Sequence, residues 1–295
     1  MIWVLFALLS AFFFSLVNVT DKYMLSRWVE KPSILLFFFG GVSLISAAVI
    51  ISTRGLPLFS VPQTLILLSI GFAHFFASVL YYHALKRGEA TRIVPLYQLA
   101  PLFVMVFAAV FLGEVFTPIR YAGIMSLIIG AFLISAEKLD KITLSKAAFL
   151  AILSCMGYAA AHTMIKYVLS FADFWTAFAY ARMGAVLALL FTAPLYFNDL
   201  ITTVKASGKK AILLPLWNES IAVLAYVFFF MAAIAGPITL VDALASFQSL
   251  FVFLIALLLG IFFPAIMKEG MSRGVILQKT VAIVLLIGGA LMVTV

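Results

Sequence analysis

Ten apolar runs, each about 20 residues long, limit most strongly what this chain can fold into. They fall at about 2–20, 33–53, 62–85, 93–113, 118–136, 147–168, 173–197, 212–235, 238–263 and 278–295. A helix needs about 20 apolar residues to cross a hydrocarbon core of ~30 Å, whereas barrel strands would alternate over about ten residues. Only 10% of the 295 residues are charged, too few to cover the surface of a soluble protein. We therefore predict an all-α membrane protein with ten transmembrane helices.

The basic residues between the runs are distributed unevenly. Each of the five odd-numbered gaps holds three Lys or Arg, whereas the even-numbered gaps and the span ends beside them hold only Arg54, Arg120 and Lys166. Lys and Arg near span ends tend to stay in the cytoplasm, so both termini are predicted to lie outside. This orientation signal explains the net charge of +8. The expected partner is therefore the lipid bilayer of the plasma (cytoplasmic) membrane, and we expect no nucleic-acid partner.

Two pairs of segments indicate an internal duplication. Segments 9–26 and 153–170 agree at six of 18 positions, and segments 123–135 and 282–294 agree at five of 13. Each half, 1–137 and 146–295, has five spans, so the second half must enter the membrane the other way up. We therefore predict two inverted five-helix repeats, an arrangement typical of secondary transporters with a substrate site near the midplane.

The segment 95–114, PLYQLAPLFVMVFAAVFLGE, together with the two five-span repeats, resembles the EamA-type family of the drug/metabolite transporter superfamily. In that family the fourth span of a repeat commonly carries a proline and an L-G-E ending, here Leu112-Gly113-Glu114. The resemblance covers essentially the whole chain. It implies an export or exchange carrier whose central cavity is lined by the first, third and fourth spans of each repeat.

Two features depart from that family. The second repeat reads Leu259-Gly260-Ile261 and lacks the glutamate. Many members keep both termini in the cytoplasm, whereas the charge count predicts the opposite here, and we follow the charge count. Glu114 itself, at the end of the fourth span, is expected to be a structural cap or an ion-pair partner.

Three charged residues inside the spans are the strongest candidates for a site. By helical rise, Arg182 lies ~13 Å from the outer edge, Glu219 ~12 Å from the inner edge and Asp242 ~7 Å from the outer edge. An isolated charge at such depth costs at least ~2.5–3.5 kcal/mol. We therefore expect Arg182 in or beside a cavity, paired with Glu219 or Asp242 in at least one conformation. A structural ion pair and a substrate or proton site both remain open.

Other polar side chains lie on the first and third spans. Asn18 aligns with His162 in the first spans of the two repeats, which suits a midplane site, although an interhelical hydrogen bond is the alternative. His74 on the third span is a candidate proton relay, because histidine changes charge near physiological pH. Tyr81 and Tyr82, further along this span, fit an aromatic belt at the membrane surface.

The fourth and ninth spans carry the remaining candidates. Pro101 should kink the fourth span near Gln98 and free a carbonyl toward a cavity. In the ninth span Asp242 and Ser246 share a face at spacing i, i+4, whereas Gln248 is turned well away from Asp242. Both cavity lining and helix packing are open for Gln248.

No motif for catalysis is present in the sequence. There is no phosphate-binding glycine loop, no metal-ligand spacing and no Ser/His/Asp arrangement, and the single Cys155 allows no internal disulfide. We therefore expect no enzyme, no metal and no cofactor. The leading hypothesis is a secondary transporter of a small organic metabolite, an exporter or exchanger coupled to protons or to exchange. A lipid-intermediate flippase and a non-transporting scaffold are the alternatives, and a homodimer is compatible with each.

Overall fold

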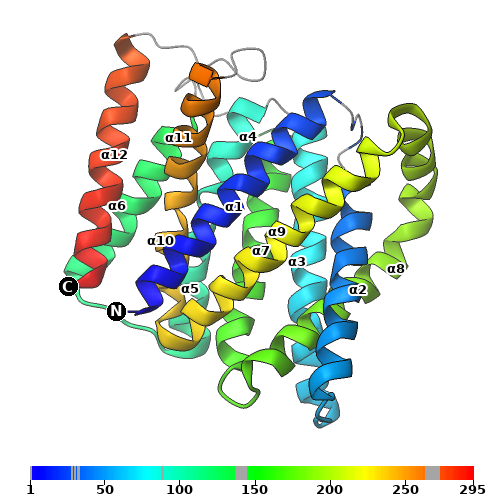
Figure 1. Cartoon of the computed structure of the whole chain (residues 1–295). Coiled ribbons are helices and arrows are strands. Elements are labelled where there is room, and N and C mark those ends of the chain that lie inside the picture. Colours follow the sequence, from blue (N-terminus) through cyan, green and yellow to red (C-terminus); the bar gives the residue numbers. More distant parts are fainter. Residues whose placement is uncertain are drawn as a thin grey trace.

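The structure is a computed structural model that describes residues 2–27, 29, 31, 34–87, 90–136, 145–262 and 273–295. Within these ranges the regular structure is entirely helical, and ten segments are long and apolar enough to cross a membrane. The predicted all-α fold with ten spans is therefore confirmed (Figure 1). Parts of two predicted cytoplasmic gaps, 137–144 and 263–272, lie outside the described residues.

Eight of the ten spans are single helices, and the fourth and ninth consist of two helices each. The first half contains α1 (Ile2–Arg27), α2 (Leu35–Arg54), α3 (Val61–Arg87), α4 (Ala90–Tyr97), α5 (Ala100–Leu112) and α6 (Pro118–Ser135). The second half contains α7 (Lys146–Val168), α8 (Phe174–Ser207), α9 (Lys210–Ala235), α10 (Ile238–Ala245), α11 (Phe247–Phe262) and α12 (Arg273–Thr294). The broken spans are α4 with α5 and α10 with α11.

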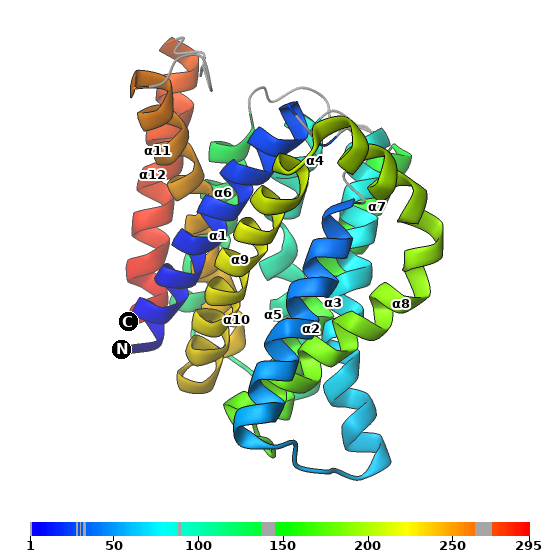
Figure 2. The same ribbon diagram turned by 45° about the vertical axis from the view of Figure 1, so that its right-hand side comes forward.

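The seventh span is longer than the sequence suggested. Its predicted end at 197 is wrong, because α8 has 34 residues and continues to Ser207. The added turns are stabilised by an ion pair of 2.6 Å between Asp199 and Lys31. At 1.5 Å per residue α8 exceeds a hydrocarbon core of ~30 Å. It contains Pro194, which removes one backbone hydrogen bond, and Figure 2 shows that the helix is bent.

Equivalent helices of the two halves make equivalent contacts across the interface between the halves. α1 packs against α9, α10 and α11, and its counterpart α7 packs against α3, α4 and α5. α6 packs against α12 (Figure 1). At this last contact the Ser126 hydroxyl donates a hydrogen bond of 2.7 Å to the carbonyl of Leu285. The repeat alignment equates these two residues, so each lies opposite its own counterpart.

Close glycine contacts between α6 and α12 also occur in equivalent pairs. A Cβ atom on Gly123 would lie 2.9 Å from the carbonyl oxygen of Gly289, and one on Gly130 would lie 2.9 Å from that of Ala282. The alignment equates Gly123 with Ala282 and Gly130 with Gly289. Replacing each residue of one contact by its aligned counterpart therefore gives the other contact. Small residues let the backbones approach this closely, as is common between membrane helices.

Lys22 and Lys166, which the alignment of segments 9–26 and 153–170 equates, lie at opposite ends of the molecule. The Lys166 ammonium donates to the carbonyls of Ala233 and Gly236, at 2.7 and 2.8 Å. Gly236 packs against Trp3, near the start of α1. Lys22 lies 19 residues further along α1, about 28 Å away by helical rise. Inverted insertion requires this placement, and superposition of the two repeats by a half-turn stays a prediction.

Candidate functional site

A cavity of about 1260 Å³, its open mouth included, lies between the two halves. It is lined by the first, third and fourth spans of both halves, with a further contribution from α2. Seven of the eight side chains that the sequence singles out line it: Asn18, His74, Gln98, His162, Glu219, Asp242 and Gln248. The structure therefore brings these residues together from helices far apart in the chain.

On α1 and α3 the cavity extends from the middle of the helix toward its C-terminal end. Its lining residues run from Phe14 to Asp21 on α1 and from His74 to Tyr82 on α3. At the opposite end of α1, Gly236 packs directly on the Trp3 ring. The charge count places the end of α1 and α3 in the cytoplasm, and that orientation remains a prediction.

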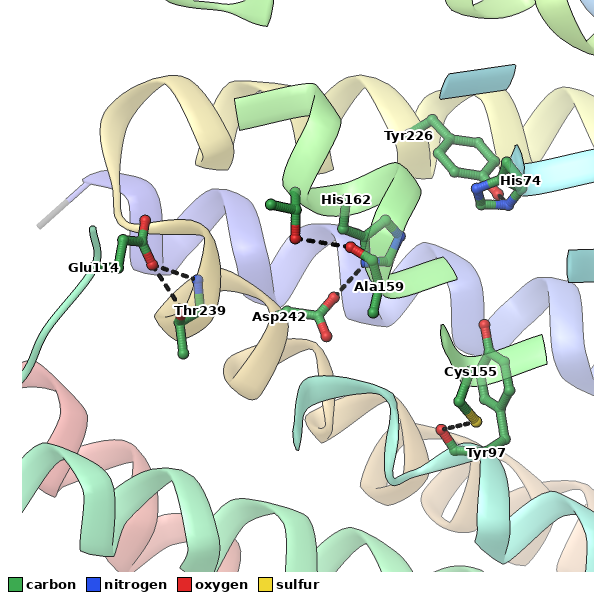
Figure 3. A network of polar contacts seen from close by, with 10 residues as sticks. His74, Tyr97, Glu114, Cys155, Ala159, His162, Tyr226, Thr239 and Asp242 are labelled. Atoms are coloured by element: carbon green, nitrogen blue, oxygen red, sulfur yellow. Dashed lines mark hydrogen bonds and ion pairs between the residues drawn. The ribbon is translucent and has the colours of Figure 1, made fainter. Parts of the chain in front are cut away.

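An ion pair between His162 and Asp242 links α7 to α10. The His162 Nδ1 atom lies 2.6 Å from a carboxylate oxygen of Asp242, and Asp242 is only 3% exposed. Figure 3 shows the two side chains pointing toward one another. A protonated imidazole would make this a charge-assisted hydrogen bond, the stronger kind. The pair therefore joins two helices of the second half at the cavity wall.

A second histidine lies close to this pair. The His74 ring is 6.2 Å from the His162 ring, between centroids, and His74 Nε2 shares a hydrogen bond with the Tyr226 hydroxyl (Figure 3). The Tyr158 hydroxyl shares a hydrogen bond of 2.8 Å with the Ser78 hydroxyl. Proton-exchanging groups are thus neighbours along one wall. Over the described ranges no group of three or more His, Cys, Asp or Glu side chains is arranged to hold a metal ion.

Arg182 lies beside the cavity and is not part of its lining. Its side chain is buried, and the guanidinium carbon lies 4.6 Å from the ring centroids of both Phe178 and Tyr226. No carboxylate oxygen of Glu219 or Asp242 lies within 4.0 Å of it in this structure. The expected ion pair is therefore not formed in this conformation, although Glu219 lies near enough to interact electrostatically with Arg182. Aromatic faces stabilise the charge instead.

The break between α4 and α5 occurs where proline predicts an interruption. The chain turns at Gln98, whose amide donates to the carbonyl of Pro95 at 3.1 Å. Pro101 has no N–H, so the carbonyl of Tyr97 cannot receive the usual helical bond. The Cys155 thiol lies 3.7 Å from this carbonyl oxygen (Figure 3). The buried cysteine therefore contacts backbone that the proline leaves free.

The break between α10 and α11 has no proline and was not predicted. The chain turns at Ser246, whose amide donates to the carbonyl of Ala243 at 3.1 Å. The Ser246 hydroxyl oxygen is buried and has no hydrogen-bond partner among the described residues. Asp242 and Gln248 lie on either side of this break, and both line the cavity.

Glu114 joins the first half to the second. Gly113 ends α5 in the left-handed conformation, at φ 68°, which glycine adopts without strain. The Glu114 carboxylate then accepts the backbone N–H groups of Ile238 and Thr239, at 2.8 and 3.0 Å, and the Thr239 hydroxyl at 2.7 Å (Figure 3). The expected structural cap is therefore confirmed, with α10 as the helix that it caps.

Several lining residues were not recognised as candidates, among them Asp21, Tyr81 and Tyr82. Asp21 lines the cavity and accepts a hydrogen bond of 2.7 Å from the Asn218 amide. The predicted first span ended at 20, although Asp21 follows Asn18 by three residues and so shares its helix face. Tyr81 and Tyr82 also line the cavity, so their expected place in a surface belt is wrong. Sequence position alone does not distinguish a wet cavity from the membrane surface.

Comparison with known proteins supports this architecture. Residues 1–136 match the EamA-like transporter family. Among 28 matching chains of solved structures, one described only as the crystal structure of a protein aligns with a TM-score of 0.69. It covers 99% of this chain and 96% of that chain at 15% identity, which shows the fold alone. No curated protein matches by sequence. The family recognised from the sequence is thus confirmed over the first half of a multi-pass membrane protein.

Proposed function

We propose that this EamA-like chain is a secondary transporter that moves a small organic solute across the plasma membrane, as an exporter or exchanger. The observation that carries the proposal is a cavity lined by the first, third and fourth spans of both halves. Secondary transporters bind their solutes near the midplane, between repeats and beside discontinuous helices. Both broken spans of this chain reach the cavity.

The contacts on each side of the cavity suggest how access alternates. Glu114 and Lys166 fasten the end where α10 begins, so that end is closed while the cavity faces the other. The His162–Asp242 pair lines the cavity and joins α7 to α10, the helices that end and begin at this closed end. A proton gained or lost there changes the attraction between α7 and α10, and His74 is placed to relay it. Proton coupling through this pair is therefore the mechanism that we propose.

Purified full-length chain in proteoliposomes tests the proposal. A panel of labelled organic solutes is measured for counterflow and for accumulation under an imposed pH gradient. We expect at least one solute to exchange, and His162→Gln to remove the pH dependence. Asp199→Asn, which removes a carboxylate outside the cavity, is the matched control and should leave exchange unchanged. Correctly inserted protein that exchanges no solute, or that moves only labelled lipid between leaflets, contradicts the proposal.

A further inference from the structure

Apart from its two histidines, the ionisable Asp, Glu, Lys and Arg side chains among the described lining residues are all acidic. Three carboxylates line it, from Asp21, Glu219 and Asp242, whereas no Lys or Arg is among its described lining residues. Arg182 is not among the lining residues, and its guanidinium carbon lies 4.6 Å from the ring centroid of Tyr226, which is one of them. An anionic solute would therefore meet carboxylates without a Lys or Arg to pair with. A cationic solute would meet opposite charge.

Five tyrosines form a continuous aromatic wall around the same space. Adjacent ring centroids lie 5.9 Å apart for Tyr82 and Tyr81, 5.3 Å for Tyr81 and Tyr97, and 5.2 Å for Tyr97 and Tyr158. His74 continues the contacts from Tyr158 to the fifth tyrosine, Tyr226. The faces of aromatic rings attract cations, and aromatic cages are a recurring way to bind ammonium groups. We name Tyr81, Tyr82, Tyr97, Tyr158 and Tyr226 the tyrosine wall.

Within the described ranges, one carboxylate of the three has no hydrogen-bond or ion-pair partner. Asp242 is paired with His162 at 2.6 Å, and Asp21 accepts the Asn218 amide at 2.7 Å. The Glu219 carboxylate lines the cavity and forms no hydrogen bond or ion pair within 4.0 Å of any described residue; its only described basic neighbour is Arg182, which interacts with it electrostatically at longer range. A charge inside a membrane protein is costly unless it is paired. Glu219 is therefore the group in the cavity that most needs a cation.

Building on the transporter function proposed above, we propose that the solute is an organic cation, a protonated or quaternary amine with an apolar body. Its ammonium group binds at Glu219 against the tyrosine wall. The apolar body contacts Phe14, Phe39 and Phe229, which also line the cavity. A bare metal ion would instead need a cluster of ligands, which the described residues do not provide.

Matched probes of one shape and different charge test this proposal directly. Phenylethylammonium and trimethyl(phenylethyl)ammonium are the cations, 2-phenylethanol is the neutral probe and 3-phenylpropionate is the anion. Binding to the purified full-length chain is measured by equilibrium dialysis. We expect both cations to bind at least about tenfold more tightly than the neutral probe, and the anion to bind more weakly still.

Variants then locate the site of binding. Glu219→Gln should weaken cation binding by about tenfold or more and leave the neutral probe unaffected, whereas Asp199→Asn should change neither. Tyr82→Leu should weaken cation binding severalfold and Tyr82→Phe should not, because phenylalanine keeps the aromatic face. This second pair keeps the test decisive if Glu219→Gln does not fold.

The possible failures are distinguishable. Equal binding of anion and cation, or no binding of either cation, overturns the cation proposal. Counterflow of a carboxylate solute in proteoliposomes would uphold the transporter and overturn the cation as its solute. Cations that bind through Glu219 but never cross the membrane with correctly inserted protein would uphold the site and overturn transport.

Discussion

The two broken spans share one plan but are stabilised in different ways. Counting back from Leu112-Gly113 and from Leu259-Gly260, the break at Leu99 in the first half is equivalent to the break at Ser246 in the second. Both breaks reach the cavity. The residues around them differ: Pro95 and Pro101 flank the first, and no proline lies within α10 or α11.

This difference separates a permanent break from a conditional one. Proline has no N–H in any conformation, so the first break persists whatever the protein does. The position equivalent to Pro95 is Asp242, which is paired with His162. The second break therefore depends on side-chain contacts, and on Glu114 at the start of α10. Side-chain contacts can form and break, so we expect α10 to be the element of the cavity wall that moves.

The largest effect should follow from removing the charge at the second break. Asp242→Asn leaves His162 without its partner, and breaking a buried ion pair costs about 3–5 kcal/mol. Initial rates in proteoliposomes should fall by roughly 100-fold or more, whereas Pro95→Ala, at the equivalent position, should reduce them only severalfold. Comparable losses in both variants would mean that the two breaks do not differ in function.

The cap on α10 should give the next largest effect. Glu114→Ala removes hydrogen bonds to a charged acceptor, each worth about 1.5–3 kcal/mol, so the closed end should loosen. Backbone amide exchange at Ile238 and Thr239 should accelerate and the thermal midpoint should fall. Thr239→Val removes only the hydroxyl donor and should have a smaller effect. Unchanged exchange at both amides in Glu114→Ala would show that the cap is dispensable.

The same contrast explains which features could be predicted from the sequence. Ten spans and the first break follow from local chemistry, namely long apolar runs and Pro101. The second break could not be predicted, because Ser246 carries no local signal and the turn depends on tertiary contacts. Helical rise gave the depth of Arg182 but not its direction, so its partner could not be identified.

A smaller effect is expected when the first break is allowed to close. Pro101→Ala restores an N–H that can bond to the carbonyl of Tyr97, a gain of about 0.5–1.5 kcal/mol. Thermal stability should rise slightly while transport slows severalfold, because a continuous helix would alter the cavity wall. Higher stability with faster transport would contradict a role for the permanent break.

Removing the buried hydroxyl at the second break should stabilise the protein slightly. The Ser246 hydroxyl has no partner among the described residues, and an unsatisfied buried group costs about 1–3 kcal/mol. Ser246→Ala should therefore raise the free energy of unfolding by about 1 kcal/mol, measured by denaturation in detergent. A loss of stability would show that another conformation uses this hydroxyl, which would strengthen the case for a moving α10.

The smallest effect belongs to Cys155, the only cysteine. A thiol is a weak donor, and its contact with the carbonyl of Leu96 is 3.5 Å long. Cys155→Ser should change stability by less than about 1 kcal/mol and leave transport intact, because the proline break does not depend on the thiol. A large loss would show that the first break, too, requires tertiary support.

The cysteine-free Cys155→Ser variant can be used to determine which of the two breaks faces which compartment. Both termini are predicted to lie outside, since five odd-numbered gaps hold three Lys or Arg each. In intact cells an impermeant maleimide should label Val295→Cys at the C-terminus. It should label Asn198→Cys, toward the far end of α8, only after the membrane is permeabilised. Transport should be unchanged by either substitution. The reverse labelling pattern would place the Glu114 cap at the cytoplasmic face, and α10 would then gate the inner rather than the outer entrance.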